Sequence, residues 1–190
     1  IYNNLLYENH ATGIALFQQD GNEPSINADI VHNTIINASN ARWCSLAVNG
    51  SSGAQVFNNI LINQHAWRGS IALDPDAVTG FDSDYNIVVN SLSNEGDGQA
   101  MTLTEWQALG YDANSMIADP LNELFVIPGS DYHLLNDAQA VDEGSAAFAF
   151  GINDDIEGTT RPQGAQHDIG AYEAEGSLAV EEEEETPDIY

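Results

Sequence analysis

The apolar positions of the first ninety residues fall into short runs, and a polar pair interrupts each run near its middle. Asparagine recurs at these interruptions, although it is depleted in β-strands because its side chain competes for backbone hydrogen bonds and favours turns. The recurrence indicates a corner between two short strands rather than a flaw within one strand. Four stretches align in this way: IYNNLLYEN from Ile1, IVHNTIINA from Ile30, QVFNNILIN from Gln55 and SDYNIVVNS from Ser83.

A second kind of short strand lies between these stretches. It reads GIALF from Gly13, SLAVN from Ser45 and SIALD from Ser70, so one period of about 25 to 30 residues holds at least three strands. A propeller blade needs roughly 40 residues and four antiparallel strands, which this spacing excludes. The pattern predicts an all-β parallel β-helix, a solenoid with three to four coils within residues 1–90.

The asparagines have a defined role in such a fold. Equivalent positions of successive coils stack about 4.8 Å apart and form ladders of like residues. Asparagine tolerates the left-handed backbone angles of a sharp corner, and its amide can bond to the asparagines above and below. We expect a structural corner ladder at Asn3, Asn33, Asn58 and Asn86.

The period ends after about residue 90, and the rest of the chain reads as a C-terminal cap. Thr102 and Glu105 have the spacing of a capping box, which predicts one short helix at residues 103–109. Residues 91–173, with short strands LFVI, YHLL and DIGAYE, should close the open end of the solenoid. Residues 174–190 carry five consecutive glutamates and read as an acidic linker or tail.

Two motifs give the chain a family resemblance. The Asn-cornered repeats resemble the right-handed parallel β-helix repeats of the pectate-lyase-like superfamily, and DIEGTTRPQGAQHDIGAYE, residues 155–173, is similar to the ending of many secreted bacterial β-helix proteins. The usual Ser-Pro before that ending is replaced by Ala138-Gln139. The resemblance implies a right-handed β-helix in a secreted or cell-surface protein. It also implies that Arg161 pairs with at least one of three carboxylates and holds the cap closed: Asp155, Asp168 and Glu173.

Charge narrows the classes of partner. The chain has 30 acidic residues against three arginines and no lysine, for a formal net charge of −27. Such a field repels nucleic acids and anionic lipid surfaces. No apolar run approaches the roughly 20 residues that span a bilayer, so we expect no membrane insertion. The candidate partners are a glycan or another protein, bound by lateral or end-on packing.

The outward residues of the second strand type are where a carbohydrate enzyme of this fold would carry its catalytic groups. Alternation predicts three rows there: Gly13 with Ser45 and Ser70, Ala15 with Ala47 and Ala72, and Phe17 with Asn49 and Asp74. Glycosidases need two carboxyl groups roughly 5 to 10 Å apart, and uronate lyases use Arg or Lys. Neither set is present in these rows, so no catalytic residue is assigned.

Two further groups are candidate binding residues. Four aspartates in LDPDAVTGFDSD could share a calcium ion or could be solvated turn residues: Asp74, Asp76, Asp82 and Asp84. Trp67 and Arg68 lie in a predicted loop between coils, where they could stack on a sugar or protein partner, or Trp67 could pack against the next coil. We expect no cofactor unless these aspartates bind calcium.

These features favour a scaffold or contact segment over an enzyme. We expect an adhesin-like, filament-forming or glycan-contacting part of a secreted or cell-surface β-helix protein. The alternative is the C-terminal part of a polysaccharide lyase or glycoside hydrolase whose catalytic coils lie upstream of Ile1.

Overall fold

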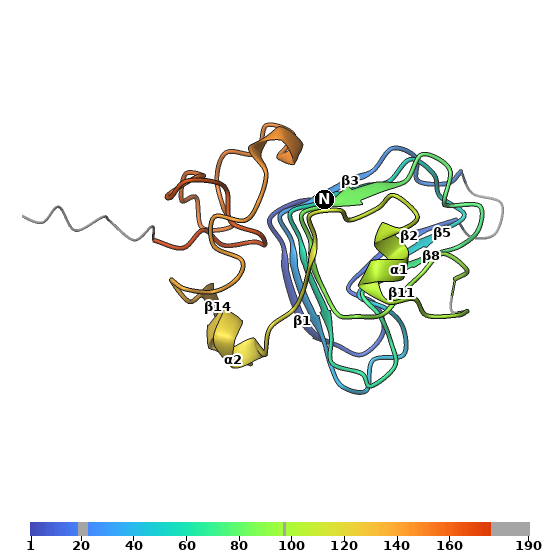
Figure 1. Ribbon diagram of the computed structural model, residues 1–190, viewed down its shortest axis with the longest axis horizontal. Coiled ribbons are helices and arrows are strands. Elements are labelled where there is room, and N and C mark those ends of the chain that lie inside the picture. Colours follow the sequence, from blue (N-terminus) through green and yellow to red (C-terminus); the bar gives the residue numbers. More distant parts are fainter. Residues whose placement is uncertain (19–22, 97, 176–190) are drawn as a thin grey trace, which may run out of the picture.

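The chain folds as a parallel β-solenoid of about four turns. The computed structural model describes residues 1–18, 23–96 and 98–175. Each turn contributes short strands to three parallel sheets, which form the walls of the coil (Figure 1). The five-stranded sheet has the order β1 (Leu5–Asn9), β4 (Thr34–Asn37), β7 (Ile60–Asn63), β10 (Ile87–Val88) and β12 (Met116–Ile117).

The other two walls follow the same stacking. The four-stranded sheet contains β2 (Ile14–Phe17), β5 (Leu46–Asn49), β8 (Ile71–Leu73) and β11 (Leu92–Ser93). The three-stranded sheet contains β3 (Asp29–Val31), β6 (Gln55–Phe57) and β9 (Asp82–Asp84). The predicted all-β solenoid is therefore confirmed.

The coil interior is filled by inward apolar residues from all three sheets. Ile35 and Leu61 come from the five-stranded sheet, Leu46 and Leu73 from the four-stranded sheet, and Val56 from the three-stranded sheet. All five are fully buried. Complete removal of a side chain of this size from water contributes roughly 1.5–3 kcal/mol, so each added turn stabilises the stack.

One end of this interior is closed by helix α1 (Leu103–Gln107), which lies inside the outline of the coil in Figure 1. The Thr102 side chain accepts from the Glu105 amide, and Glu105 accepts from the Thr102 amide, so a capping box starts the helix. Trp106 is fully buried and belongs to the interior cluster. The helix is two residues shorter than the 103–109 predicted, because Ala108 already forms its C-cap.

The remaining C-terminal segment, residues 119–175, lies beside the coil rather than on its end (Figure 1). It contains α2 (Leu121–Leu124), the antiparallel pair β13 (Phe125–Ile127) and β14 (Asp131–Leu134), and the 3-10 turn η1 (Ala146–Phe148). We call residues 119–175 the covering segment. The sequence predicts that residues 91–173 close the open end of the solenoid, whereas the covering segment lies against its side. α2 is a second short helix beyond the one predicted.

The covering segment packs on the outward side of the five-stranded sheet, which we call the covered face. That side of the sheet presents four buried isoleucines: Ile36, Ile60, Ile62 and Ile87. The covering segment supplies the apolar residues opposite them: Leu124, Phe125, Tyr132, Leu134 and Ile169. These contacts form a second core, separate from the coil interior.

The predicted acidic tail begins slightly later than expected. Ala174 is buried, and its amide donates to Asp168 Oδ2 at 2.6 Å, so it still belongs to the fold. Residues 176–190, which hold the five glutamates, lie outside the described residues. Within the described part of the chain, no helix is long and apolar enough to cross a membrane.

Candidate functional site

An asparagine ladder runs along the stack, but its register differs from the predicted one. The hydrogen-bonded row is Asn4, Asn33, Asn59 and Asn86, which we call the ladder row. In each step the upper amide nitrogen donates to the Oδ1 of the next asparagine: 2.8 Å from Asn4, 2.9 Å from Asn33 and 3.1 Å from Asn59. Of the four predicted members, Asn33 and Asn86 lie in this row, while Asn3 and Asn58 lie one residue before it.

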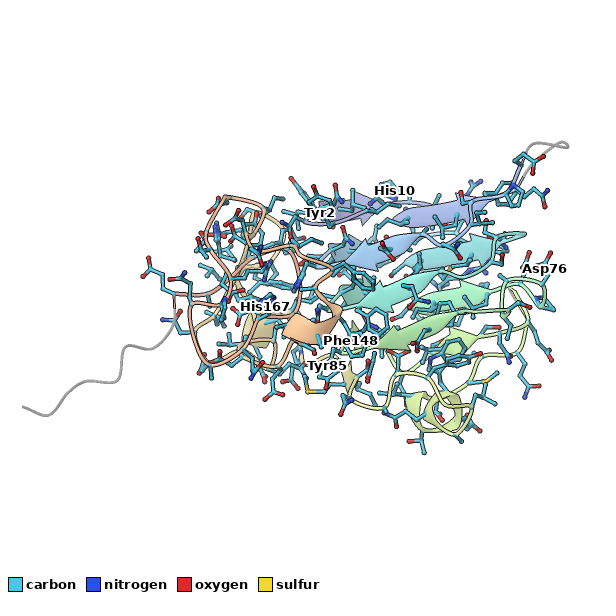
Figure 2. All side chains as sticks on the ribbon, turned by 90° about the horizontal axis from the view of Figure 1, so that it is seen from above. Tyr2, His10, Asp76, Tyr85, Phe148 and His167 are labelled. Carbon is cyan, nitrogen blue, oxygen red and sulfur yellow. The ribbon has the colours of Figure 1, made fainter. Side chains whose placement is uncertain are left out.

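A second row precedes the ladder row and has the left-handed backbone expected at a corner. Asn3, His32, Asn58 and Tyr85 have φ between 52° and 57°, and we call them the corner row. All four meet the covering segment. The Nδ2 of Asn3 donates to the Asp154 carbonyl at 2.6 Å, Asn58 exchanges two bonds with the Ser145 backbone, and Tyr85 lies beside Phe148 (Figure 2). The predicted ladder thus mixed two rows with different partners.

The ladder row ends on a carboxylate that the sequence reasoning missed. Asn86 Nδ2 donates to Asp112 Oδ1 at 2.9 Å, and Trp106 Nε1 donates to Oδ2 at 2.7 Å. The hydroxyls of Ser83 and Ser115 complete the set. Burial raises the pKa of Asp112, and these four donors oppose that rise. In each step one N–H of the side-chain amide points toward Asp112, so the chain of amide dipoles ends on this carboxyl group.

Arg161 lies buried in the covering segment and pairs with one carboxylate. Its guanidinium donates to Glu173 Oε2 at 2.6 Å and to the carbonyls of Gly170 and Asp168 at 2.8 and 3.2 Å. Asp168 accepts the amides of Asp142 and Ala174 instead. Asp155 accepts the amides of residues 157, 159 and 173. The arginine and three carboxylates therefore form one network, in which Asp155 and Asp168 cap backbone groups.

The outward side of the four-stranded sheet has a floor of small residues. Ala15, Ala47, Ala72 and Ser93 pair in register across β2, β5, β8 and β11. The predicted row of Ser45 and Ser70 does not face outward. Both serines are fully buried at the corner, where the Ser70 hydroxyl donates to the Leu61 carbonyl and accepts the Val89 amide.

Aromatic residues and one arginine surround this floor, and we call the whole surface the aromatic face. The guanidinium carbon of Arg68 lies 4.0 Å from the centre of the Trp67 ring and 5.1 Å from that of Trp43. Trp67 is 62% exposed and Phe17 is 55% exposed. Trp67 therefore does not pack into the neighbouring coil. A cation held between two indole faces is fixed by its attraction to the ring quadrupoles.

Two hollows flank Trp43 on the aromatic face. One, of about 320 Å³, is lined by Thr12, Ala15, Phe17, Ala47 and Asn49, and the other, of about 230 Å³, lies between Trp67, Arg68, Ala72 and Ser93. Trp43 lines both hollows. Sequence reasoning found Trp67 and Arg68 but missed Trp43. The signal was available, because Trp43 and Arg68 each stand three residues before paired positions, Leu46 and Ile71.

The described residues of the aromatic face supply neither a catalytic pair nor a metal site. No carboxylate is among the described residues that line the two hollows. The four aspartates considered for calcium are not gathered, since no group of three or more His, Cys, Asp or Glu within residues 1–18, 23–96 and 98–175 is placed to hold a metal. Asp84 instead accepts the Asn114 amide groups and the Tyr85 amide.

Comparisons with protein-family models, with curated proteins and with solved structures gave no match for this chain. The fold and the side-chain geometry are therefore the basis of the functional proposal.

Proposed function

We propose that this chain is a non-catalytic contact scaffold of a secreted or cell-surface β-helix protein, similar to the pectate-lyase-like superfamily, and that its aromatic face binds neutral glycans. The observation that carries the proposal is the pairing of exposed aromatic rings with a flat floor of small side chains. Apolar lining with a few placed polar groups is typical of small-molecule sites.

The aromatic rings supply the contact area. Phe17 and Trp67 expose more than half of their surface, and aromatic side chains dominate the energy of binding surfaces. The C–H groups of a sugar ring form an apolar patch that can stack on such rings. Asn49, Ser93 and Thr12 lie at the hollows and offer hydrogen bonds to hydroxyl groups.

Charge favours neutral glycans over uronates. The formal net charge of −27 repels polyanionic chains over a Debye length of about 10 Å at moderate salt. Arg68 is stacked between two indoles, and a single fixed cation does not offset that field. Neutral oligosaccharides avoid this repulsion, and their binding should respond weakly to salt.

Binding without cleavage is expected from the residues present. Glycoside hydrolysis requires two carboxyl groups flanking the bond, and the described lining of the hollows contains none. The scaffold proposal therefore requires that a bound neutral oligosaccharide be recovered intact after long incubation.

Calorimetric titration with a panel of neutral and uronate oligosaccharides, with and without calcium, tests the proposal. We expect saturable binding of neutral members only, independent of calcium. Trp67→Ala and Phe17→Ala should each weaken binding about tenfold or more, because a contact residue at the centre of an interface contributes more than about 1.4 kcal/mol.

Phe150→Ala is the matched control, because Phe150 is 49% exposed but lies on the covering segment. The Phe150→Ala variant should bind the neutral oligosaccharide with the same affinity as the unmodified protein. Equal losses for Phe17→Ala and Phe150→Ala, or release of shortened products, would contradict the proposal.

A further inference from the structure

His32 is the one histidine of the corner row, and it lies at the contact between the coil and the covering segment. Its side chain is fully buried, and two groups of the covering segment buried to a similar degree face it: His167 at 5% and Arg161 at 4% exposure. The ring centres of His32 and His167 are 5.4 Å apart. Figure 2 shows His167 in the covering segment, beside the ends of the stacked strands.

The two ring nitrogens of His32 have weak hydrogen bonding among the described residues. Within the described part of the chain, its Nε2 makes two long contacts, each of 3.4 Å, to Asn58 Nδ2 and to His167 Nδ1. Its Nδ1 is buried and makes no hydrogen bond of acceptable geometry with the described residues. The backbone carbonyls of Asp168 and Gly170 are near the ring, but they provide partial charge only.

The three carboxylates of the Arg161 network already have other partners. Glu173 pairs with Arg161 at 2.6 Å, Asp168 accepts the amides of Asp142 and Ala174, and Asp155 accepts three backbone amides. None of them forms a salt bridge with either histidine. A proton added to His32 would therefore place a second buried cation beside Arg161 without a counter-ion, which costs several kcal/mol.

The described apolar core inside the coil contains no residue of the covering segment. It reaches from the first turns to Trp106 and Tyr111, whereas residues 119–175 pack against the outside of the coil, in the second core and in ring contacts such as that of Phe148 with Phe57. The coil can therefore stay folded while the covering segment moves away, and local opening of this kind is common in proteins.

We propose that the buried pair His32 and His167 is an acid-sensitive latch, whose protonation releases the covering segment from the covered face of the solenoid. Release would expose the isoleucine row of the five-stranded sheet and the corner row. It would also place both histidines in water, where each can hold a proton.

The direction of the effect follows from the protonation equilibria. Burial, then Arg161 and His167, lowers the pKa of His32 from 6.5 to about 2, and burial and Arg161 also lower the pKa of His167. The released state then binds more protons below pH 6.5, so acid favours it. Asp168 acts in the opposite direction, because burial raises its pKa to about 6, and Glu173 shares that direction. A comparison of variants must therefore isolate His32.

Amide hydrogen exchange measured from pH 7.5 to 5 tests the latch. The reporters are the amides of Ser145, Gly170 and Ala171, which bond the covering segment to the coil. The references are the ladder-row amides of Asn33 and Asn59. We expect the opening constant of the unmodified protein at the reporters, divided by that of His32→Gln, to rise about thirtyfold between pH 7.5 and 5, because His32 takes up a proton near pH 6.5 in the released state.

His32→Gln should lack this contribution to opening, while the references stay protected in both proteins. His167→Gln is the second variant, and it should lack a smaller contribution. His65→Gln is the control, because His65 lies in the loop before Trp67, and it should keep the full response. The same acid response in His32→Gln, His167→Gln and the unmodified protein would overturn the latch. Loss of protection at reporters and references together would overturn it as well.

Discussion

Two walls of the same solenoid present outward faces of opposite character. The covered face of the five-stranded sheet presents Ile36, Ile60 and Ile62, and a segment of more than fifty residues lies over it. The aromatic face of the four-stranded sheet presents Ala15, Ala47 and Ala72. Only two side chains, Trp43 and Arg68, are described as covering part of this row, and Phe17 and Trp67 remain exposed to solvent. Large aliphatic rows require cover, whereas small rows leave a surface available for a ligand.

The largest expected effect comes from opening the network inside the covering segment. Arg161→Ala should lower the free energy of unfolding by roughly 2–5 kcal/mol, because Glu173 would remain as a buried carboxylate without its partner. Urea denaturation measures this loss. Arg42→Ala is the control, since Arg42 is exposed. An unchanged urea midpoint for Arg161→Ala would show that the network does not stabilise the covering segment.

The comparison of the two faces can be tested with one truncation on each. Ile60→Ala on the covered face should cost about 2–4 kcal/mol, because it leaves a cavity between the sheet and the covering segment. Phe17→Ala on the aromatic face should cost about 0.5 kcal/mol or less, as for exposed positions in general. Similar losses for both variants in thermal unfolding would remove the distinction between the faces.

Asparagines of the ladder row should contribute more to the stability of the fold than asparagines on exposed loops. Asn59→Ala removes the acceptor of the Asn33 amide groups and leaves Asn86 Oδ1 without its side-chain donor. Buried unsatisfied groups cost about 1–3 kcal/mol each, so we expect a loss of about 2–3 kcal/mol. Asn40→Ala, at an exposed turn position, should change the stability little. If Asn59→Ala changed the stability as little as Asn40→Ala in denaturant titrations, the ladder would not contribute to the stability of the fold.

The smallest expected effect is a pH dependence of stability carried by His32. The lowered pKa means that folding requires a neutral ring, so the contribution is constant above pH 6.5 and is lost as the pH falls below it. Between pH 7.5 and 5, the unmodified protein should lose about 2 kcal/mol relative to His32→Gln. Parallel stability curves for the two proteins would contradict the assigned burial of a neutral His32.

Sequence periodicity was sufficient for the solenoid and for the asparagine corner, but not for the register. Asn3-Asn4 and Asn58-Asn59 each offer two candidates, whereas Asn33 stands alone. The true row is the residue immediately before the paired strand that follows, which starts at Thr34 after Asn33 and at Ile60 after Asn59. In each coil the residue immediately before the ladder asparagine has the left-handed backbone and turns the chain.

The lateral position of the covering segment also had an overlooked signal. Strands β4 and β7 read TIIN and ILIN, apolar on both sides of the sheet and buried at every position. Continuous apolar strands are typical of sheets covered on both faces. β2, at the edge of the four-stranded sheet, instead alternates between buried and exposed residues, whereas the outward alanines of β5 and β8 are buried with Trp43 packed against them. The sequence could not show which carboxylate pairs with Arg161, because Asp155, Asp168 and Glu173 all lie around it in the fold.

Hydrogen exchange of the intact chain, with and without a neutral oligosaccharide from the binding panel, tests most directly whether the aromatic face binds glycans. We expect slower exchange along residues 42–49 and 65–73 on the aromatic face, with no change in the covering segment. Protection confined to residues 119–175, or none at saturating oligosaccharide, would contradict the claim that the aromatic face is the binding surface.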